Sequence, residues 1–400
     1  MREKNNIIWE VSNLLEEVNQ VRLGDKILYI STVEDGRPYQ GVKKKIGMQC
    51  SAFEHIGLEV TAINSGRRST YGQIEKLLPF SYGINYRDIR SSINKLERNS
   101  FQYCYVRYSP ATRGLIDVFK TIKELQNGIK IVLEIPTYPY EDEFKSLKAK
   151  PSMLRERLYR NKMQEYVDLV ITPSHIDEQK IFGIPALEIT NGIDAERISV
   201  RSIAPKKDNI VNLIGVALIT PKQGYDRVIR GLSEYIKSKQ TNEPDVYFYI
   251  IGTGAIKKEL EELCHQLNIE KYVVFTGEKD GQELEYYYSI GDLGVGTLGL
   301  FKTNELMKVN SLKTREYCAK GLPFIITDCD YKFAESNEDF FMVIKDSEEP
   351  VDIRRSIQFL NELRGKYKEE QIVSKMTAFA KKNLSWATIL KTVIETVDNQ

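Results

Sequence analysis

The stretch VNSLKTREYCAKGLPFI, residues 309–325, decides the fold because it joins a short helix to a buried strand. Ser311 is a favourable N-cap residue, since its side chain can accept a hydrogen bond from the first helical turn. Gly321 is the expected stop, because glycine readily adopts the left-handed conformation that ends many helices. Pro323 prevents further helix, and the apolar residues 324–326 begin a strand. The stretch therefore predicts one helix–strand step of an α/β domain.

The helix carries charged side chains at its opening end, and capping does not account for Glu316. A capping box would place its carboxylate at position 314, which is a threonine. One explanation is an ion pair with Lys320 four residues further on, worth about 0.2–0.5 kcal/mol. The other is that Glu316 contacts a ligand, and the helix by itself leaves both open.

On both sides of this stretch, strand-like runs alternate with helical ones along the whole chain, as is typical of parallel α/β sheets. The expected strands are 26–32, 58–63, 101–108, 130–135, 168–174, 186–190, 209–218, 246–252, 272–277, 293–298, 323–327 and 340–344. A polar segment, 191–209, fits a linker, and an apolar helical run at 386–397 closes the chain. We therefore expect two doubly wound domains, 1–195 and 209–380, with residues 381–400 packing back on the first.

Composition is that of an ordinary soluble protein, with 42% apolar and 28% charged residues among 400. The five cysteines form no CxxC pair and the three histidines are far apart, which argues against a disulfide framework and a zinc or histidine metal site. The nearest match to an acidic metal motif, Asp328-Cys329-Asp330, follows a strand away from the 309–325 helix. We expect no metal and no cofactor.

Charge is unevenly distributed, because residues 37–163 hold 23 lysines and arginines against 12 acidic residues while the whole chain has a net charge of only +1. Lys43 to Lys45, Arg67, Arg68 and a helix at 152–163 with an apolar strip supply much of this excess. Such a region suits an anionic membrane or an anionic substrate, although an ordinary solvated surface explains it as well. Nucleic acid is not an expected partner, since no groove-reading motif is present.

No uncharged apolar run approaches the roughly 18 residues of a membrane span. The first 20 residues are interrupted by glutamates and are interpreted as an amphipathic helix rather than a signal peptide. A cytoplasmic protein is therefore expected, peripheral on the inner face of the membrane if the basic region binds lipid.

Glycines follow several expected strands, at the sheet edge where α/β proteins bind ligands. They allow the backbone to approach a phosphate or a base closely. No GxGxxG or GxxxxGK[ST] motif occurs, so a nicotinamide enzyme and a P-loop ATPase are disfavoured.

Several segments in the right order resemble the family 4 glycosyltransferases, retaining enzymes of the GT-B fold, and most closely the bacterial branch that builds capsular and exopolysaccharides. The segments are GVKKKIGMQCSAFEHIGLEV (41–60), LEIPTYPYEDE (133–143), VDLVITPS (167–174), TNGID (190–194), KQGYDRVIRGL (222–232), IIGTGAIKKELEEL (250–263), VVFTGEKDGQEL (273–284) and SLKTREYCAKGLPFI (311–325). The resemblance implies two Rossmann-like domains with a cleft between them and a nucleotide-sugar donor, UDP- or GDP-linked, on the second domain.

The resemblance also implies roles for individual residues. Glu316 matches the second glutamate of an E-x7-E motif, which binds the ribose hydroxyls, and the amides of Ser311 and Leu312 match those that hold the donor phosphate. Lys222 lies near the family's phosphate-binding cation. The loops expected to line the donor pocket contribute Gly41, Gly252, Thr253, Gly254, Gly277, Glu278 and Lys279.

The chain departs from the family pattern at three positions. Lys308 stands where the first glutamate of the motif belongs, the usual arginine before the phosphate loop is absent, and Gln223 instead of a lysine directly precedes Gly224. Lys302, Lys308 and Lys313 are candidates for the missing charge.

On the acceptor side, Glu134 is expected either to position a substrate hydroxyl or to be satisfied by backbone amides. Tyr138 and Tyr140 are candidates for stacking on a sugar ring, with ordinary packing as the alternative. The implied acceptor is a glycan or a polyprenyl-diphosphate-linked sugar. The expected activity is therefore metal-independent, retaining glycosyl transfer, hexosyl transfer in particular. The alternatives are a non-catalytic GT-B subunit that stabilises a partner glycosyltransferase, and a hydrolase or epimerase acting on a free nucleotide sugar.

Overall fold

The computed structural model of the protein describes residues 24–34, 40–66, 82–140, 150–195, 197–205, 209–303, 308 and 310–400. The amphipathic helix expected in the first 20 residues and the basic pair Arg67 and Arg68 lie outside these ranges. The chain divides into two compact units, one formed by Met1–Thr190 and Trp386–Gln400 and the other by Asn191–Ser385.

The first unit is built on a seven-stranded sheet in the order β2-β1-β3-β4-β5-β7-β6, parallel except for the antiparallel pairing of β6 with β7. Its strands are β1 (Lys26–Ser31), β2 (Glu59–Asn64), β3 (Tyr103–Arg107), β4 (Lys130–Glu134), β5 (Leu169–Thr172), β6 (Lys180–Ile181) and β7 (Ile184–Glu188). The order 2-1-3-4-5 of the first five strands is one of the two common doubly wound orders.

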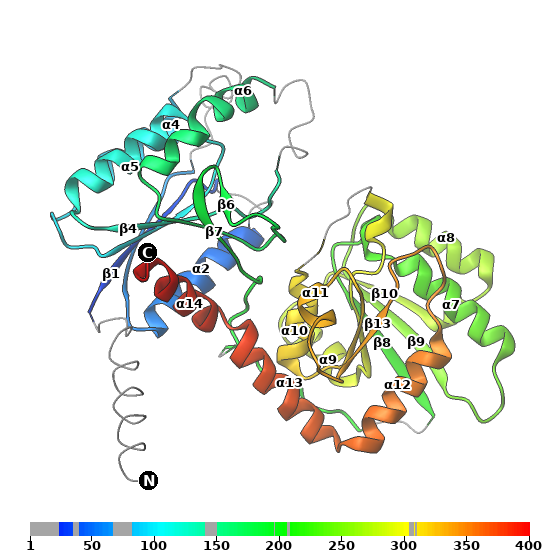
Figure 1. Ribbon diagram of the computed structural model, residues 1–400. Coiled ribbons are helices and arrows are strands. Elements are labelled where there is room, and N and C mark those ends of the chain that lie inside the picture. The colour runs from blue at the N-terminus through cyan, green and yellow to red at the C-terminus, as the bar shows by residue number, and fades with distance from the viewer. Residues whose placement is uncertain are drawn as a thin grey trace, which may run out of the picture. The chain divides into compact units, whose positions relative to one another are not determined.

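Helices cover both faces of this sheet (Figure 1). They are α2 (Gln40–His55), α4 (Ile84–Ile93), α5 (Arg113–Leu125), α6 (Lys150–Tyr159), the short 3-10 helix η4 (Arg160–Glu165) and α14 (Trp386–Asp398). One apolar core lies between the sheet and α4 and α5, and the other lies between the sheet and α2 and α14. The C-terminal helix is therefore part of the first unit.

The second unit has a fully parallel six-stranded sheet in the order β10-β9-β8-β11-β12-β13. Its strands are β8 (Ile210–Val216), β9 (Asp245–Ile251), β10 (Val273–Gly277), β11 (Leu293–Val295), β12 (Phe324–Thr327) and β13 (Phe341–Ile344). Counted along the chain, this order is 3-2-1-4-5-6, the Rossmann arrangement, and it reverses direction between β8 and β11.

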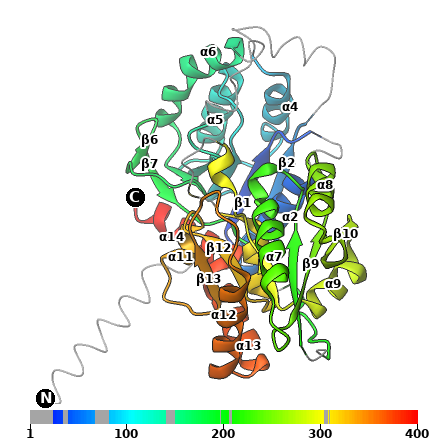
Figure 2. The same cartoon turned by 90° about the vertical axis from the view of Figure 1, so that its right-hand side faces the viewer.

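The helices of this unit again form two layers. They are η5 (Pro221–Gln223), α7 (Tyr225–Ser238), α8 (Lys257–Leu267), η6 (Glu270–Tyr272), α9 (Gly281–Ile290), η7 (Leu300–Thr303), α10 (Leu312–Lys320), α11 (Tyr331–Ala334), α12 (Ile353–Lys366) and α13 (Glu369–Leu384). The layer of α7 and α8 shares one core with the sheet, and the layer of α9, α10 and α13 shares the other. Figure 2 shows α7 and α8 in front of the sheet.

The expected strands are confirmed to within about three residues. Of the strands in the described ranges, only the two-residue β6 has no counterpart among them. Helix α10 begins after Ser311 and ends before Gly321, whose φ is +74°, as its sequence predicts. The segment interpreted as a linker differs, because it packs on the second unit. Ile193 is buried there, and the buried Arg201 guanidinium donates to the carbonyls of Gly291 and Gly321 and pairs with Glu369.

Candidate functional site

The candidate site lies where β8 and β11 are neighbours, since ligands of open α/β sheets bind outside the carboxyl ends of strands at the point where the strand order reverses. Two loops meet there. The amide of Leu298, after β11, donates to the Gln223 carbonyl at 3.1 Å, and the amide of Gly299 donates to that of Lys222 at 3.1 Å. A side chain at Gly224 would come within 2.5 Å of Leu298 and its φ is +65°, so this close approach requires glycine.

Lys313 connects the two loops to the opening turn of α10. Its ammonium nitrogen donates to the Gln223 side-chain oxygen at 2.5 Å and to the Gly296 carbonyl at 2.9 Å. It also lies over the ring of Tyr225, 5.2 Å from its centroid. Burial and then the charge of Lys222 lower the pKa of Lys313 to about 7, although Asp330 acts in the opposite direction. The site thus holds a cation that lacks a direct carboxylate partner within the described chain.

The opening turn of α10 presents backbone donors beside this cation. Ser311 is the N-cap residue, but its hydroxyl accepts no hydrogen bond from the helix. Within the described part of the chain, nothing accepts a hydrogen bond from the amides of Leu312 and Lys313. Free amides at a helix N-terminus favour an anion, and the helix dipole adds to that preference.

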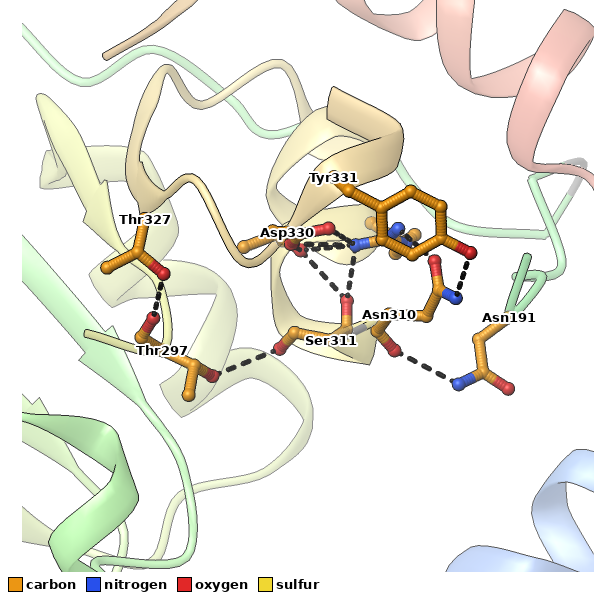
Figure 3. Close-up of polar contacts among 9 residues, drawn as sticks. Asn191, Thr297, Asn310, Ser311, Thr327, Asp330 and Tyr331 are labelled. Carbon is orange, nitrogen blue, oxygen red and sulfur yellow. Dashed lines mark hydrogen bonds and ion pairs between the residues drawn. The ribbon is translucent and has the colours of Figure 1, made fainter. Parts of the chain in front are cut away.

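A buried ion pair fixes the position of this turn (Figure 3). The Arg315 guanidinium, 0% exposed, donates to the two Asp330 carboxylate oxygens at 2.6 and 2.8 Å and to the Asn310 side chain at 2.7 Å. The Thr314 hydroxyl also donates to Asp330, at 2.7 Å. The Asn310 carbonyl accepts from Asn191 at 3.0 Å. These contacts hold Asn310, the residue before the N-cap, against the rest of the second unit.

The Asp328-Cys329-Asp330 segment therefore does not lie away from the helix, as its place in the sequence suggested, because Asp330 is the direct partner of Arg315. Among the described residues, no group of three or more histidine, cysteine, aspartate or glutamate side chains forms a metal site.

Glu316 has no ion-pair partner among the described residues, and the surface-pair explanation is wrong. The Lys320 ammonium instead pairs with Glu285 at 2.5 Å and donates to the Ser199 carbonyl at 3.3 Å. Burial and then the charge of Glu316 raise the pKa of the Tyr288 phenol, which indicates that the carboxylate lies beside this tyrosine of α9. Glu316 is half-buried.

The predicted glycine loops pack against the loop after β8. A side chain at Gly252 would lie 2.0 Å from the Ala217 carbonyl oxygen, and one at Gly254 would lie 2.1 Å from that of Ile219. The Gly252 amide donates to Gly277 at 2.8 Å, so the ends of β9 and β10 are joined here. Thr253 and Glu278 are exposed, and Lys279 is half-buried and pairs with Glu283 at 2.7 Å. These glycines allow close packing of backbones at the sheet edge.

Three further lysines are candidates. Lys222 is exposed on η5, and it is the neighbouring charge that acts on the pKa of Lys313. Lys308 is exposed, with its nitrogen 5.1 Å from the ring centroid of Tyr331. Lys302 pairs with Asp226 at 2.5 Å. Of the three candidates for the missing charge, Lys313 lies directly between the two loops.

The remaining predicted residues belong to the first unit. Gly41 lies in the first turn of α2, not in a loop. Glu134, at the end of β4, is 0% exposed. Its carboxylate pairs with Lys45 at 2.8 Å and Arg107 at 3.2 Å and accepts from Tyr105 at 3.0 Å. Burial alone would raise the pKa of Glu134, but the two cations and the hydrogen bonds lower it to about 2. Side chains satisfy this carboxylate, not the backbone amides that were one of the two alternatives for it, and it does not reach the surface.

Tyr140 is a packing residue. It is 4% exposed, its hydroxyl donates to the buried Glu156, and its ring lies 5.5 Å from that of Tyr108. Tyr138 is half-buried, with its ring edge-on to Phe182 at 6.1 Å. Stacking of Tyr140 on a sugar is therefore excluded in this structure, and Tyr138 keeps part of its surface.

Two side-chain contacts of the site had no signal in the sequence. Asp330 lies 15 residues from Arg315, and Gln223 lies 90 residues from Lys313, so no local spacing connects either pair. Only the topology, which places the ends of β8, β11 and β12 together, brings these partners into contact.

Comparison with known proteins supports this description of the second unit. Residues 194–375 match the family profile described as glycosyl transferases group 1. The chain is 27% identical over 100 residues to an uncharacterized glycosyltransferase, MJ1607, of Methanocaldococcus jannaschii, a match that spans 25% of this chain and 24% of that relative.

Solved structures extend the likeness to both units. HepE of Anabaena in complex with UDP is 14% identical with a TM-score of 0.58, over 94% of this chain and 100% of the other. The apo form of the lipopolysaccharide outer core galactosyltransferase WaaB is 14% identical with a TM-score of 0.57, over 94% and 100%. At this identity the likeness shows the fold. Residues 194–375 are therefore similar to the glycosyl transferases group 1, and the chain as a whole has the GT-B fold.

Proposed function

We propose that the protein is a retaining glycosyltransferase that moves a sugar, a hexose in particular, from a UDP- or GDP-linked donor to a glycan or a polyprenyl-diphosphate-linked acceptor in surface polysaccharide synthesis. The single observation that carries the donor assignment is the placement of Lys313 across the two switch-point loops, beside the free amides of α10. This is the place and the chemistry that a diphosphate requires.

In the proposed complex the diphosphate accepts hydrogen bonds from the amides at the start of α10 and lies next to Lys313. Negative charge grows on the departing nucleoside diphosphate as the glycosidic bond breaks. Fixed donors aimed at that charge lower the barrier, and one such donor is worth about 3–4 kcal/mol in enzymes where it has been removed. Arg315 and Asp330 hold these donors in place without touching the substrate.

Glu316 is assigned to the ribose. A carboxylate accepts hydrogen bonds from two neighbouring hydroxyls at once, and Glu316 has no cation to satisfy it within the described residues. The Gly252–Gly254 and Gly277–Lys279 loops would surround the base. Metal-independent transfer is part of the proposal, with Lys313 and Lys222 as the cations near the leaving group.

Glu134 acts in the proposed enzyme as a positioning residue of the first unit. Its charge fixes Lys45 and Arg107 at the carboxyl end of β4, near the sheet edge where the acceptor is expected. It contacts no substrate itself, because it is completely buried.

Membrane contact through α6 is a further part of the proposal. Leu154 and Leu158, one turn apart, are 55% and 49% exposed, and the exposed cations Arg157 and Lys162 lie on the same segment. Met153, expected in the same apolar strip, is instead buried. An exposed apolar pair among cations suits an anionic bilayer but binds weakly alone. No described helix has the length and apolarity to cross a membrane.

The second candidate function is a non-catalytic GT-B subunit. The lysine at position 308, where the resemblance places a glutamate, favours it, because a donor-sugar contact would be altered.

Binding of nucleotides tests the donor assignment. A ligand at 100 times its dissociation constant stabilises the fold by about 2.7 kcal/mol, which raises the melting temperature. We expect UDP or GDP at millimolar concentration to do so, and uridine without phosphates to do so much less. If neither diphosphate shifts melting, the donor site is refuted. If one shifts melting but no nucleotide sugar is turned over with any acceptor, the non-catalytic alternative is favoured.

A further inference from the structure

A cavity of about 270 Å³ lies in the second unit, away from the candidate donor site. Its wall includes Asn212, the third residue of β8, and Asp292, which directly precedes β11. Both lie toward the amino ends of their strands, whereas the donor site lies beyond the carboxyl ends. With a rise of about 3.3 Å per residue, Asn212 is roughly 13 Å from the end of β8. The cavity is therefore a separate feature of the same sheet.

Tyrosines form the aromatic part of this cavity. Tyr247 and Tyr249 are two residues apart on β9, so their side chains share one face of the sheet. Tyr286 of α9 forms part of the rim and is 59% exposed. The ring of Tyr287 continues the group, 5.8 Å from that of Tyr249 and 5.4 Å from that of Tyr286. A partly exposed aromatic group of this kind marks an interaction site more often than a single exposed ring does.

Apart from Asp292, the polar groups of the described cavity wall are neutral. Within the described residues, the buried side-chain oxygen of Asn212 has no hydrogen-bond partner. The hydroxyls of Tyr247, Tyr249 and Tyr286 are further neutral donors and acceptors of the wall. Burial and the neighbouring phenols raise the pKa of Tyr249, so its hydroxyl stays protonated at neutral pH. Buried acceptors without a partner are uncommon in folded proteins, and a ligand hydroxyl would supply one.

Charge restricts the class of ligand. No lysine or arginine is among the described residues that line the cavity, and its one carboxylate, Asp292, pairs with Arg364 at 2.5 Å. Among the described lining residues, a phosphate or a uronic acid would therefore meet no cation. Flat aromatic faces together with neutral donors and acceptors suit a ligand that has both C–H faces and hydroxyls.

We infer that this cavity, the tyrosine subsite, binds one residue of a neutral oligosaccharide. Its volume is slightly below the roughly 300–1,000 Å³ of sites that enclose a drug-sized ligand, so the rest of the glycan passes over the exposed ring of Tyr286. The subsite would keep a growing or acceptor glycan on the second unit independently of the donor. The inference goes beyond the proposed transfer reaction and does not depend on the identity of the donor.

The test is calorimetric titration of the full chain with maltopentaose, cellopentaose and chitopentaose, and with pentagalacturonate as the anionic counterpart. UDP is present throughout so that the donor site is occupied. We expect at least one neutral pentasaccharide to bind and pentagalacturonate to bind at least tenfold more weakly. Tyr286→Ala should weaken binding of the neutral glycan at least tenfold, whereas Tyr286→Phe, which keeps the ring, should change it less than threefold.

Controls separate the subsite from the fold and from the donor site. Tyr286 is mostly exposed, so Tyr286→Ala should melt like the wild type and keep the same response to UDP. Tyr159 is a half-buried tyrosine of the first unit, so Tyr159→Ala should leave glycan binding unchanged. Three results would overturn the inference: no neutral glycan binds at millimolar concentration, Tyr286→Ala binds it as tightly as the wild type, or light scattering shows that Tyr286→Ala only dissociates a dimer.

Discussion

Lys313 gives the proposed donor site a pH dependence that can be worked out from the structure. In the free protein its pKa is about 7, because of burial and the charge of Lys222. An anionic diphosphate beside the nitrogen favours the protonated form, so binding raises this pKa. Binding above pH 7 must then take up a proton, and affinity falls about tenfold for each further pH unit. Between pH 6 and pH 8.5 the expected loss is about 30-fold.

Isothermal titration with a nucleotide sugar measures this coupling. A nucleotide sugar is preferable to UDP, because a terminal phosphate itself titrates near pH 6, about the value for phosphate monoesters. At pH 8 the heat should depend on the ionisation enthalpy of the buffer and report uptake of about 0.9 proton, compared with about 0.1 at pH 6. Lys313→Met should bind the nucleotide sugar more weakly at pH 6. It should show neither the proton uptake nor the loss of affinity as the pH rises.

Two matched variants sharpen the test. Lys237→Met removes an exposed cation of α7 and should keep the wild-type profile. Gln223→Glu places a carboxylate where Lys313 now donates at 2.5 Å, which should raise its pKa and move the decline above pH 8.5. If the wild type binds a nucleotide sugar equally well at pH 6 and pH 8.5, or if Lys313→Met shows the same decline, the assignment of Lys313 to the diphosphate is refuted.

Three further variants test other parts of the structure. Glu316→Ala should weaken nucleotide binding or turnover at least tenfold, about 1.4 kcal/mol, with unchanged melting of the free protein; wild-type kinetics would remove Glu316 from the site. Asp330→Ala leaves the buried Arg315 guanidinium without its carboxylate and should lower the free energy of unfolding by about 3–5 kcal/mol in urea titrations. The double variant with both Arg315→Met and Asp330→Leu should lose less stability, because no buried charge is left unpaired. The pKa of Glu134 is lowered to about 2, so its stabilisation is complete above about pH 4.5 and is lost as the pH falls toward 2. Glu134→Gln should therefore destabilise the protein at pH 7 and flatten its acid unfolding between those values, and an acid profile identical to the wild type would contradict the ion pairs with Lys45 and Arg107.

The sequence predicts the fold well because its signals are local. Strand periodicity, the N-cap at Ser311 and the stop at Gly321 each depend on a few neighbouring residues, and the structure has them where they are expected. The site was predictable only as far as the resemblance reached. Contacts between distant segments decided the rest. Lys320 pairs with Glu285 instead of Glu316, and Glu134 is satisfied by side chains from α2 and β3 instead of backbone amides.

These long-range contacts also explain how α10 can carry the side chains proposed to bind the donor without becoming unstable. A helix of nine residues is too short to be stable alone. Its anchoring is provided by side chains that face inward, namely Arg315 on Asp330, the Tyr317 hydroxyl on the Ile214 carbonyl, and Lys320 on Glu285. Because these residues hold the helix, Lys313 and Glu316 on the same helix are free of a structural ion pair within the described residues. The charged side chains of α10 thus divide into two sets. One set fixes the helix, and the other is proposed to bind the ligand. Substitutions in the first set should therefore change stability and nucleotide affinity together, whereas substitutions in the second should change affinity without lowering stability.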